Sequence, residues 1–295
     1  MRCAVVGCGL AGLATAYALV KRGVEVVLYD LFPVGEKPGG IESALLHPYP
    51  GKKGLRSKYA HDALSQTMHL IGVAERALGK KVAIKNGILR KNWSPEEWAY
   101  DLEPYDQDVL ITSGVTVFYK EYLKGLFAAL SSCVFIQGPM ENEKEFDQVV
   151  YTIGSGFMDW KIEGVQYVKG QVLLVQEQKK ITRSMIGSGH ISPTLHTKIV
   201  QIGATYEHFP DNDLPNVEEA KKYLAPRIKS FLAPMDTWKI VECRACIRVC
   251  HKTSYLPIIR RISDKQIIYT GLGSRGLLYH ALYGQYAADE IFKEE

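Results

Sequence analysis

The residues with the clearest chemical potential are three glycines near the start of the chain, in the pattern Gly7-x-Gly9-x-x-Gly12. An apolar strand-like segment precedes them and a mostly apolar helical stretch follows. In such a unit the first glycine permits a tight turn, the second lets the backbone approach a pyrophosphate, and the third lets helix and strand pack closely. The N–H groups at the start of the helix, including those of Leu10 and Ala11, then favour an anion.

An acidic residue stands where such a motif needs it. A second apolar strand ends at Asp30, eighteen residues beyond Gly12. A carboxylate at this distance can accept hydrogen bonds from ribose hydroxyls. The sequence therefore predicts a dinucleotide site, against the alternative of a glycine-rich turn in a plain α/β protein, and this motif alone leaves FAD and NAD open.

A second strand–glycine–helix unit closes the chain. The strand is expected at residues 266–270 and the helix at about 277–292. The loop between them supplies further candidate cofactor contacts at Gly273, Ser274, Arg275, Gly276 and Leu277. An NAD dehydrogenase rarely needs a returning unit of this kind, so its presence favours FAD. An ordinary terminal strand and helix is the alternative.

The remaining elements follow from hydrophobic periodicity and turn residues. Residues 32–54 are expected to form a long loop, and Ser57 to cap a helix at 58–78. Further strands are expected at 115–118, 134–136, 146–153, 172–175, 181–185, 198–202 and 239–250, and further helices at 120–130 and 217–232. Gly154, after the strand that ends at 153, is another candidate cofactor contact. The strands beyond 165 are joined by turns, which fits an antiparallel sheet.

These elements predict an α/β protein with a Rossmann-type FAD-binding domain and a discontinuous α+β substrate domain built on an antiparallel sheet. The FAD-binding domain is expected to comprise residues 1–58, 115–160 and 255–295. The substrate domain is expected to comprise residues 59–114 and 161–254.

Six segments, in order, resemble one known family. They are the first glycine motif with Asp30, the loop 40–50 that contains Leu46-His47-Pro48-Tyr49, Lys169-Gly170-Gln171, Gly203-Ala204-Thr205-Tyr206, Leu256-Pro257, and Gly271 to Leu277. The chain resembles the D-amino-acid-oxidase-type FAD oxidoreductases, which include glycine oxidase and sarcosine oxidase. Within that family it is most similar to the oxidase domain of the bifunctional tRNA 5-methylaminomethyl-2-thiouridine biosynthesis proteins, in stand-alone form.

This resemblance implies FAD as cofactor and oxidation of a CH–NH bond. The substrate would be 5-carboxymethylaminomethyl-uridine at the tRNA wobble position, converted to aminomethyl-uridine and glyoxylate. A separate methyltransferase would then act on the product. A small-molecule glycine or D-amino-acid oxidase or dehydrogenase is the second hypothesis, and a non-catalytic nucleotide-binding protein is the third.

Substrate contacts are expected mainly from arginine, because the guanidinium fork matches the two oxygens of a glycyl carboxylate. Arg275 and Arg248 are the first candidates and Arg244 is the third, each against the alternative of a structural ion pair. His47 lies in the loop expected near the flavin. Tyr206 and Tyr279 are candidates for lining the site, although single aromatic residues more often belong to the core.

Composition limits the remaining possibilities. The net charge is +4, which is too mild to require a polyanionic partner. Four basic clusters are candidate contacts for tRNA phosphates: Lys52-Lys53-Arg56-Lys58, Lys80-Lys81-Lys85, Lys179-Lys180-Arg183 and Arg260-Arg261. No metal site is expected, because Cys243 and Cys246 would point to opposite faces of a strand.

The six cysteines are expected to be reduced thiols in a cytoplasmic protein, since no secretory signal pattern opens the sequence. No apolar run reaches eighteen residues, so no contact with a membrane is expected.

Overall fold

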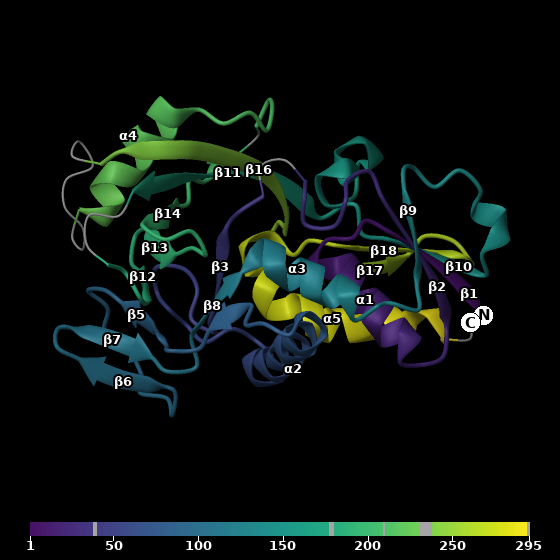
Figure 1. Ribbon diagram of the computed structural model, residues 1–295, viewed down its shortest axis with the longest axis horizontal. Coiled ribbons are helices and arrows are strands. Elements are labelled where there is room, and N and C mark those ends of the chain that lie inside the picture. The colour runs from purple at the N-terminus through teal and green to yellow at the C-terminus, as the bar shows by residue number, and fades with distance from the viewer. Residues whose placement is uncertain (38–39, 177–179, 209, 230–237, 294–295) are drawn as a thin grey trace.

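Figure 1 shows the computed structural model, which describes residues 1–37, 40–176, 180–208, 210–229 and 238–293. A sheet with covering helices lies beside a second, larger sheet. We call the first the nucleotide-binding part and the second the substrate part.

The nucleotide-binding part is built on a six-stranded sheet. Its order is β17 (Ile258–Arg261), β18 (Gln266–Thr270), β10 (Gln148–Tyr151), β1 (Arg2–Val6), β2 (Glu25–Asp30) and β9 (Val134–Gln137). All neighbours are parallel except β17, which runs antiparallel to β18 at the edge. The carboxyl ends of β1, β2, β10 and β18 therefore share one edge, which is where open parallel sheets bind ligands.

Four helices form the main core with one face of this sheet. They are α1 (Leu10–Val20), α2 (Ala60–Leu78), α3 (Tyr119–Ala128) and α5 (Gly276–Ile291). The opposite face packs a smaller cluster that includes Phe146 and Phe157, the latter from the 3₁₀ segment η2 (Gly154–Trp160). Both faces are covered, which explains why β1, β10 and β18 are almost continuously apolar.

Two parallel helices are packed unusually closely in this core. An ideal Cβ on Gly284 of α5 would lie 2.8 Å from the Cβ of Ala14 in α1. One on Gly276, at the start of α5, would lie 3.8 Å from Leu10 Cδ1 at the start of α1. The two helices therefore begin side by side.

The substrate part is a nine-stranded sheet. Its path is β15 (Glu207–His208), β11 (Val165–Gln176), β14 (Ile199–Gly203), β13 (His190–Pro193), β12 (Ser184–Ile186), β5 (Ile88–Arg90), β7 (Asp108–Ile111) and β6 (Leu102–Tyr105), and β16 (Ile240–His251) pairs with β11. The pairs are antiparallel except β12 with β5. Helix α4 (Val217–Ile228) covers β11 and β14.

A three-stranded sheet joins the two parts: β3 (Ser43–Leu46), β8 (Val115–Phe118) and β4 (Ala83–Ile84). Buried polar side chains tie it to the large sheet. The amide of Gln201 accepts from the N–H of Ser43 at 3.3 Å and donates to its carbonyl at 2.8 Å, and Ser43 Oγ lies 2.6 Å from Ser192 Oγ. The expected fold class is confirmed, and the large sheet is antiparallel as expected apart from one pair.

Three local expectations are corrected. Residues 43–46 form strand β3 inside the predicted loop, because they pair with β8. Ser57 is not a helix cap: α2 begins at Ala60 after a left-handed Tyr59, and Ser57 Oγ makes no hydrogen bond to any described residue. Helix α4 ends at Ile228, and residues 230–232 of the predicted helix lie outside the described residues.

The placement of α2 bears on the proposed division of the chain. Ala63, Leu70, Ile71 and Ala74 of α2 belong to the same buried cluster as α1, α3 and α5. We therefore propose that α2, provisionally assigned to the substrate domain, belongs with the nucleotide-binding part. No helix in the described part of the chain is long and apolar enough to cross a membrane.

Replacing Gly284 with Ala tests the α1–α5 contact. The added methyl would overlap Ala14, so we expect a loss of about 1–3 kcal/mol of stability and a lower Tm in thermal unfolding. In the matched variant Gly72→Ala, the methyl meets only the flexible guanidinium of Arg76 at 3.3 Å in helix α2. This control should be neutral or slightly stabilised, and equal Tm values for both variants would contradict the close packing.

Candidate active site

The first glycine motif forms a tight turn against the neighbouring strand end. Gly7 has a φ of +101°, and Thr152 Oγ1 donates to its carbonyl at 2.7 Å and to that of Val6 at 3.0 Å. An ideal Cβ on Gly12 would lie 1.8 Å from the Gly7 carbonyl oxygen. Only glycine fits at position 12, so the turn and the start of α1 are held together as the sequence predicted.

The middle glycine is different, because a Cβ on Gly9 would meet no protein atom within 4 Å. Gly9 also has an ordinary φ of −80°. Neither backbone strain nor packing explains a glycine here. Space kept open in front of the N–H groups of a helix start fits a phosphate-bearing ligand.

Asp30 lies at the end of β2, beside this turn. Its Oδ2 accepts from the N–H of Cys8 at 2.7 Å, and its Oδ1 accepts from the N–H of Phe32 at 3.0 Å. These bonds fix the carboxylate at the shared edge of the sheet. Each oxygen keeps further acceptor capacity, which suits ribose hydroxyls.

Two more predicted cofactor contacts lie at the same edge. Gly154 follows β10 with a φ of +55°, and a Cβ there would meet no protein atom within 4 Å. The closing loop, residues 271–276, follows β18 and contains the 3₁₀ turn η4 (Gly273–Arg275) before α5 begins. The sequence-predicted glycine segments, almost the length of the chain apart, therefore converge at the amino ends of α1 and α5. This arrangement fits the elongated FAD molecule.

Arg275 is available to a ligand. Its guanidinium lies over the ring of Tyr255 at 4.8 Å and makes no hydrogen bond or ion pair with any residue the structure describes. His47 lies close enough to Arg275 for the charge of the guanidinium to shift the pKa of the imidazole. Removal from water and the charges of Arg90, His190 and Arg275 lower the pKa of His47 to about 3, so its imidazole is neutral at physiological pH. His47 Nδ1 accepts from the N–H of Tyr49 at 3.2 Å.

Arg248 reaches the site from β16 of the substrate part. Its Nη2 donates to the carbonyl of Thr205 at 2.7 Å, and its guanidinium lies over Tyr206 at 5.1 Å. A Cβ on Gly170 would lie 1.7 Å from Arg248 Nη2, which explains the glycine in the Lys169-Gly170-Gln171 segment.

Cys250 connects these residues to the closing loop. It forms an isolated bridge with Leu272, and its Sγ would lie 2.9 Å from a Cβ on Gly273. The end of β16 and the loop before α5 are therefore in direct contact.

Sequence reasoning missed His190. It lies on β13 with its ring against Gly203, where a Cβ would be 2.6 Å from the ring. Removal from water and the charge of Arg248 lower the pKa of His190 to about 4. The electrostatic interaction with His190 in turn helps to lower the pKa of His47. Only the pairing of β13 with β14 brings His190 to Gly203, so local sequence gave no signal for it.

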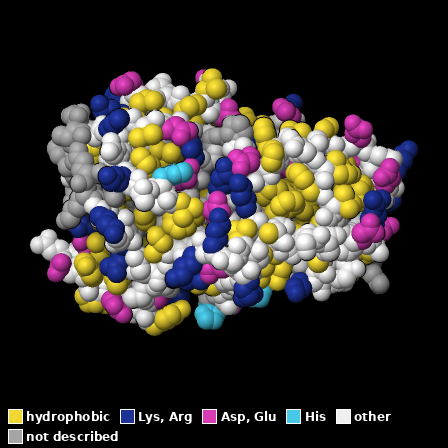
Figure 2. Space-filling model, viewed as in Figure 1, with side chains coloured by type: hydrophobic (Ala, Val, Ile, Leu, Met, Phe, Trp, Pro, Cys, Tyr) yellow, Lys and Arg dark blue, Asp and Glu magenta, His cyan; other side chains and the backbone are white. Residues whose placement is uncertain are grey.

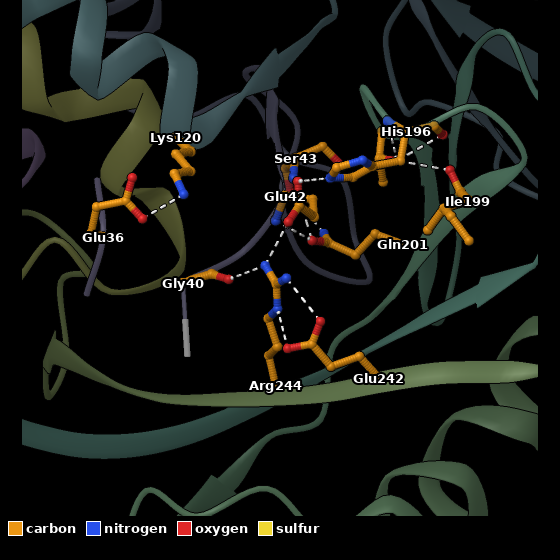
Figure 3. Close-up of polar contacts among 11 residues, drawn as sticks. Glu36, Gly40, Glu42, Ser43, Lys120, His196, Ile199, Gln201, Glu242 and Arg244 are labelled. Carbon is orange, nitrogen blue, oxygen red and sulfur yellow. Dashed lines mark hydrogen bonds and ion pairs between the residues drawn. The ribbon is translucent and has the colours of Figure 1, made fainter. Parts of the chain in front are cut away.

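Arg244 has a structural environment (Figure 3). Its guanidinium contacts Glu42 Oε1 at 2.6 Å, the two carboxylate oxygens of Glu242 at 2.7 and 2.9 Å, and the carbonyl of Gly40 at 3.0 Å. It joins β16 to the segment before β3 and has little capacity left for a substrate. Tyr279 is likewise part of the core, fully buried with its hydroxyl donating to the carbonyl of Lys58 at 2.9 Å.

The cysteine segment of β16 does not assemble a metal site. Cys243 and Cys246 pair with Leu173 and Gly170, and because they are three residues apart on one strand they point to opposite faces of it. His251 Nδ1 accepts backbone N–H groups of the following turn. Within the described ranges, no group of three metal-ligating side chains is arranged to hold an ion.

Comparison with known proteins identifies the family. Residues 2–102 and 73–290 match the family model described as DAO, FAD dependent oxidoreductase. The chain belongs to this family. It is therefore an FAD-dependent oxidoreductase. We propose that the turn at 7–12, Asp30 and the closing loop are the residues that would hold its FAD.

Solved structures share the fold along the whole chain. Glycine oxidase from Bacillus cereus is 18% identical, with a TM-score of 0.76 over 98% of this chain and 94% of that one. Glycine oxidase from Geobacillus kaustophilus is 16% identical, with a TM-score of 0.77 over 100% and 95%. Iminodiacetate oxidase from Chelativorans sp. BNC1 is also 16% identical, with a TM-score of 0.77 over 100% and 96%.

A curated relative matches over a short segment. The tRNA 5-methylaminomethyl-2-thiouridine biosynthesis bifunctional protein MnmC of Leptospira interrogans is 41% identical over 46 residues. The match covers 16% of this chain and 7% of that protein.

Replacing Gly9 with Val tests whether the open space at this position is needed for FAD binding rather than for packing within the protein. The side chain enters open space, so the apoprotein should keep its Tm, whereas FAD binding should weaken by at least about tenfold. FAD binding is measured by quenching of flavin fluorescence during titration of the apoprotein. Gly12→Ala is the control, because its overlap with Gly7 should lower the Tm of the apoprotein itself. Unchanged FAD affinity in Gly9→Val would contradict the assignment.

The neutral histidines predict a pH dependence of stability. Removal from water lowers the pKa of His190 and of His280 to about 4, from an ordinary 6.5. Between these values the unfolded chain binds protons that the folded chain does not, so stability is full above pH 6.5 and falls as the pH decreases toward 4. His190→Gln should flatten the decline of Tm between pH 7 and 5, and the exposed His61→Gln should not. A decline that is the same in all three proteins would contradict the burial argument.

Proposed function

We propose that this enzyme oxidises a secondary amine that carries a carboxylate, namely the glycyl group of 5-carboxymethylaminomethyl-uridine at the tRNA wobble position. The observation that carries the proposal is the group formed by Arg275, Arg248, His47 and His190. It combines an arginine free of described polar partners with two neutral imidazoles, of which His47 is close to Arg275 and His190 is close to Arg248.

Each residue has a definable task in this proposal. Arg275 and Arg248 bind the glycyl carboxylate, because a guanidinium offers two parallel N–H donors. His47 Nδ1 already accepts from the N–H of Tyr49, so the proton of this neutral imidazole is on Nε2, which donates a hydrogen bond to the substrate. His190 accepts a hydrogen bond from the amine, and because both imidazoles are neutral they keep positive charge away from its nitrogen. An amine must be neutral to lose a hydride from the adjacent carbon.

Bound FAD supplies the hydride acceptor for this step. The N–H groups at the start of α5 favour negative charge on whatever lies against them. Hydrolysis of the oxidised C–N bond then gives glyoxylate and aminomethyl-uridine. A separate methyltransferase would take the latter product.

A small-molecule substrate is the second candidate. The solved structures that match the whole chain include two glycine oxidases and an iminodiacetate oxidase, whereas the match to MnmC is short. Glycine, a primary amine, and iminodiacetate, a secondary amine, both carry the nitrogen on a carbon that bears a carboxylate, so the same arginines would bind them. The size of the substrate, rather than the chemistry, separates the two candidates.

The deciding experiment compares substrates under anaerobic conditions. The purified enzyme is mixed with glycine, with iminodiacetate, or with carboxymethylaminomethyl-modified tRNA, and loss of flavin absorbance is followed. Rapid bleaching by the tRNA, with glyoxylate formed and aminomethyl-uridine seen by nucleoside mass spectrometry, supports the first candidate. Bleaching by the small amines alone would replace it with the second.

Arg248→Lys tests carboxylate binding. Loss of the bidentate fork should lower kcat/KM for a glycyl substrate on the order of 100-fold, while flavin content stays unchanged. Arg244→Lys makes the same change on the same strand, at the ion pair with Glu42 and Glu242. It should lower Tm with little effect on kcat/KM, and equal kinetic effects in the two variants would contradict the role of Arg248.

A further inference from the structure

We propose that residues 51–59, which we call the basic loop, form the edge of the active-site mouth that binds the phosphate backbone of an RNA substrate. This inference rests on the tRNA form of the proposed function. It selects one surface from the four basic clusters of the sequence.

The basic loop carries an uncompensated positive charge. Lys52, Lys53, Arg56 and Lys58 all lie on the surface, and the segment contains no acidic residue. Arg56 pairs with the buried carboxylate of Asp101 at 3.0 Å. The three lysines form no ion pair with any residue in the described ranges. Several phosphates can therefore be neutralised without breaking existing pairs.

Two of the other clusters have cations that already contact protein groups. Lys80 pairs with Glu121 at 2.6 Å, and Lys85 pairs with Glu75 at 2.9 Å. Arg261 donates to the carbonyls of Asp264 and Glu290. Figure 2 shows one face of the molecule, on which Lys and Arg side chains lie in several places, often beside Asp and Glu. Abundance of cations therefore does not single out a binding surface. The basic loop is distinguished because it combines lysines without an ion-pair partner among the described residues with direct contacts to the candidate active site.

The loop is held in one conformation from within. The buried guanidinium of Arg90 donates to the carbonyls of Tyr49 at 2.5 Å, Gly51 at 2.6 Å and Lys52 at 3.2 Å. Trp93 Nε1 donates to the carbonyl of Lys53 at 3.1 Å. These inward-facing carbonyls fix the backbone while Lys52 and Lys53 remain exposed. A pre-ordered loop loses less conformational entropy when it binds.

Two further contacts place the loop at the candidate active site. The N–H of Ser57 donates to the carbonyl of Pro48 at 2.7 Å, directly after His47. The carbonyl of Lys58 accepts from Tyr279 in the first turn of α5. The basic loop therefore runs from the histidine beside the closing loop to the helix that follows it.

Exposed aromatic rings accompany the cations. The Arg56 guanidinium lies over Tyr100 at 5.1 Å, and Tyr100 is 77% exposed. Lys58 Nζ lies over Tyr59 at 4.7 Å, and Tyr59 is 45% exposed. Proteins bind unpaired bases by stacking them on such rings and guanidinium planes. An anticodon loop offers both unpaired bases and closely spaced phosphates, which suits this surface better than a small amino acid does.

The test reverses charge on the two lysines. The variant Lys52→Glu with Lys53→Glu should bind tRNA at least about tenfold more weakly at moderate salt, and its slope of log K against log salt should fall by about two. Binding is measured by fluorescence anisotropy of labelled tRNA with the FAD-loaded enzyme. The control, Lys144→Glu with Lys265→Glu, changes exposed lysines near the opposite, amino-terminal edge of β10 and β18 and should bind as the wild type does.

Two readouts keep the loop and the proposed function apart. The loop variant should retain wild-type flavin bleaching by iminodiacetate or glycine, where these are substrates. Unchanged tRNA affinity and salt slope in the loop variant would overturn the inference even if the wild type oxidises tRNA. Failure of the wild type to oxidise modified tRNA would overturn the proposed function, and the binding measurement would still decide whether the loop contacts RNA.

Discussion

The close packing of α1 against the turn at Gly7 and against α5 is the constraint on which the arrangement of the candidate active site depends. Gly12 allows the helix to start against the carbonyl of Gly7, and Gly284 allows α5 to lie along α1. Because both helices begin together at the carboxyl edge of a parallel sheet, their N–H groups face a common region. A long anionic cofactor is the ligand such a region binds best, and a side chain at position 12 would separate the turn from the helix.

Buried polar contacts, and not apolar packing alone, fix the position of the substrate part relative to the nucleotide-binding part. Gln201 and Ser192 of the large sheet bond to Ser43 of β3, and Arg244 of β16 pairs with Glu42. Such bonds are directional, so they fix the register of one part on the other. Arg248 and His190 are thereby brought toward the side of His47 and Arg275. The junction thus stabilises the placement of one part on the other, while the substrate contacts come from the residues of the site itself.

The glycine turn that we propose holds the cofactor was predictable from sequence because its determinants are local. Gly7, Gly9, Gly12 and Asp30 lie within one strand–helix–strand unit, and the closing loop repeats the signal. The structural ion pair was named as the alternative for Arg244, but its partner Glu42 could not be predicted because it is about two hundred residues away in the sequence. Strand β3 was missed for a similar reason, since its pairing with β8 outweighs the loop-like composition around it. Arg90 and His190 contact residues that are distant in the sequence, and such contacts produce no periodic pattern in the sequence around either residue.

The same distinction applies to substrate recognition. Family membership establishes FAD as the cofactor, and the geometry of the first glycine turn is consistent with it. The choice between a modified tRNA and a free amine depends on surface features, such as the basic loop, whose partners lie outside the chain.

The most direct test of the central claim is a crystal structure of the protein with FAD bound. The account predicts the pyrophosphate against Gly9, the ribose at Asp30, and the flavin ring between His47 and the closing loop at the start of α5. A flavin ring bound away from the closing loop, or a pyrophosphate held anywhere other than the turn at residues 7–12, would contradict it.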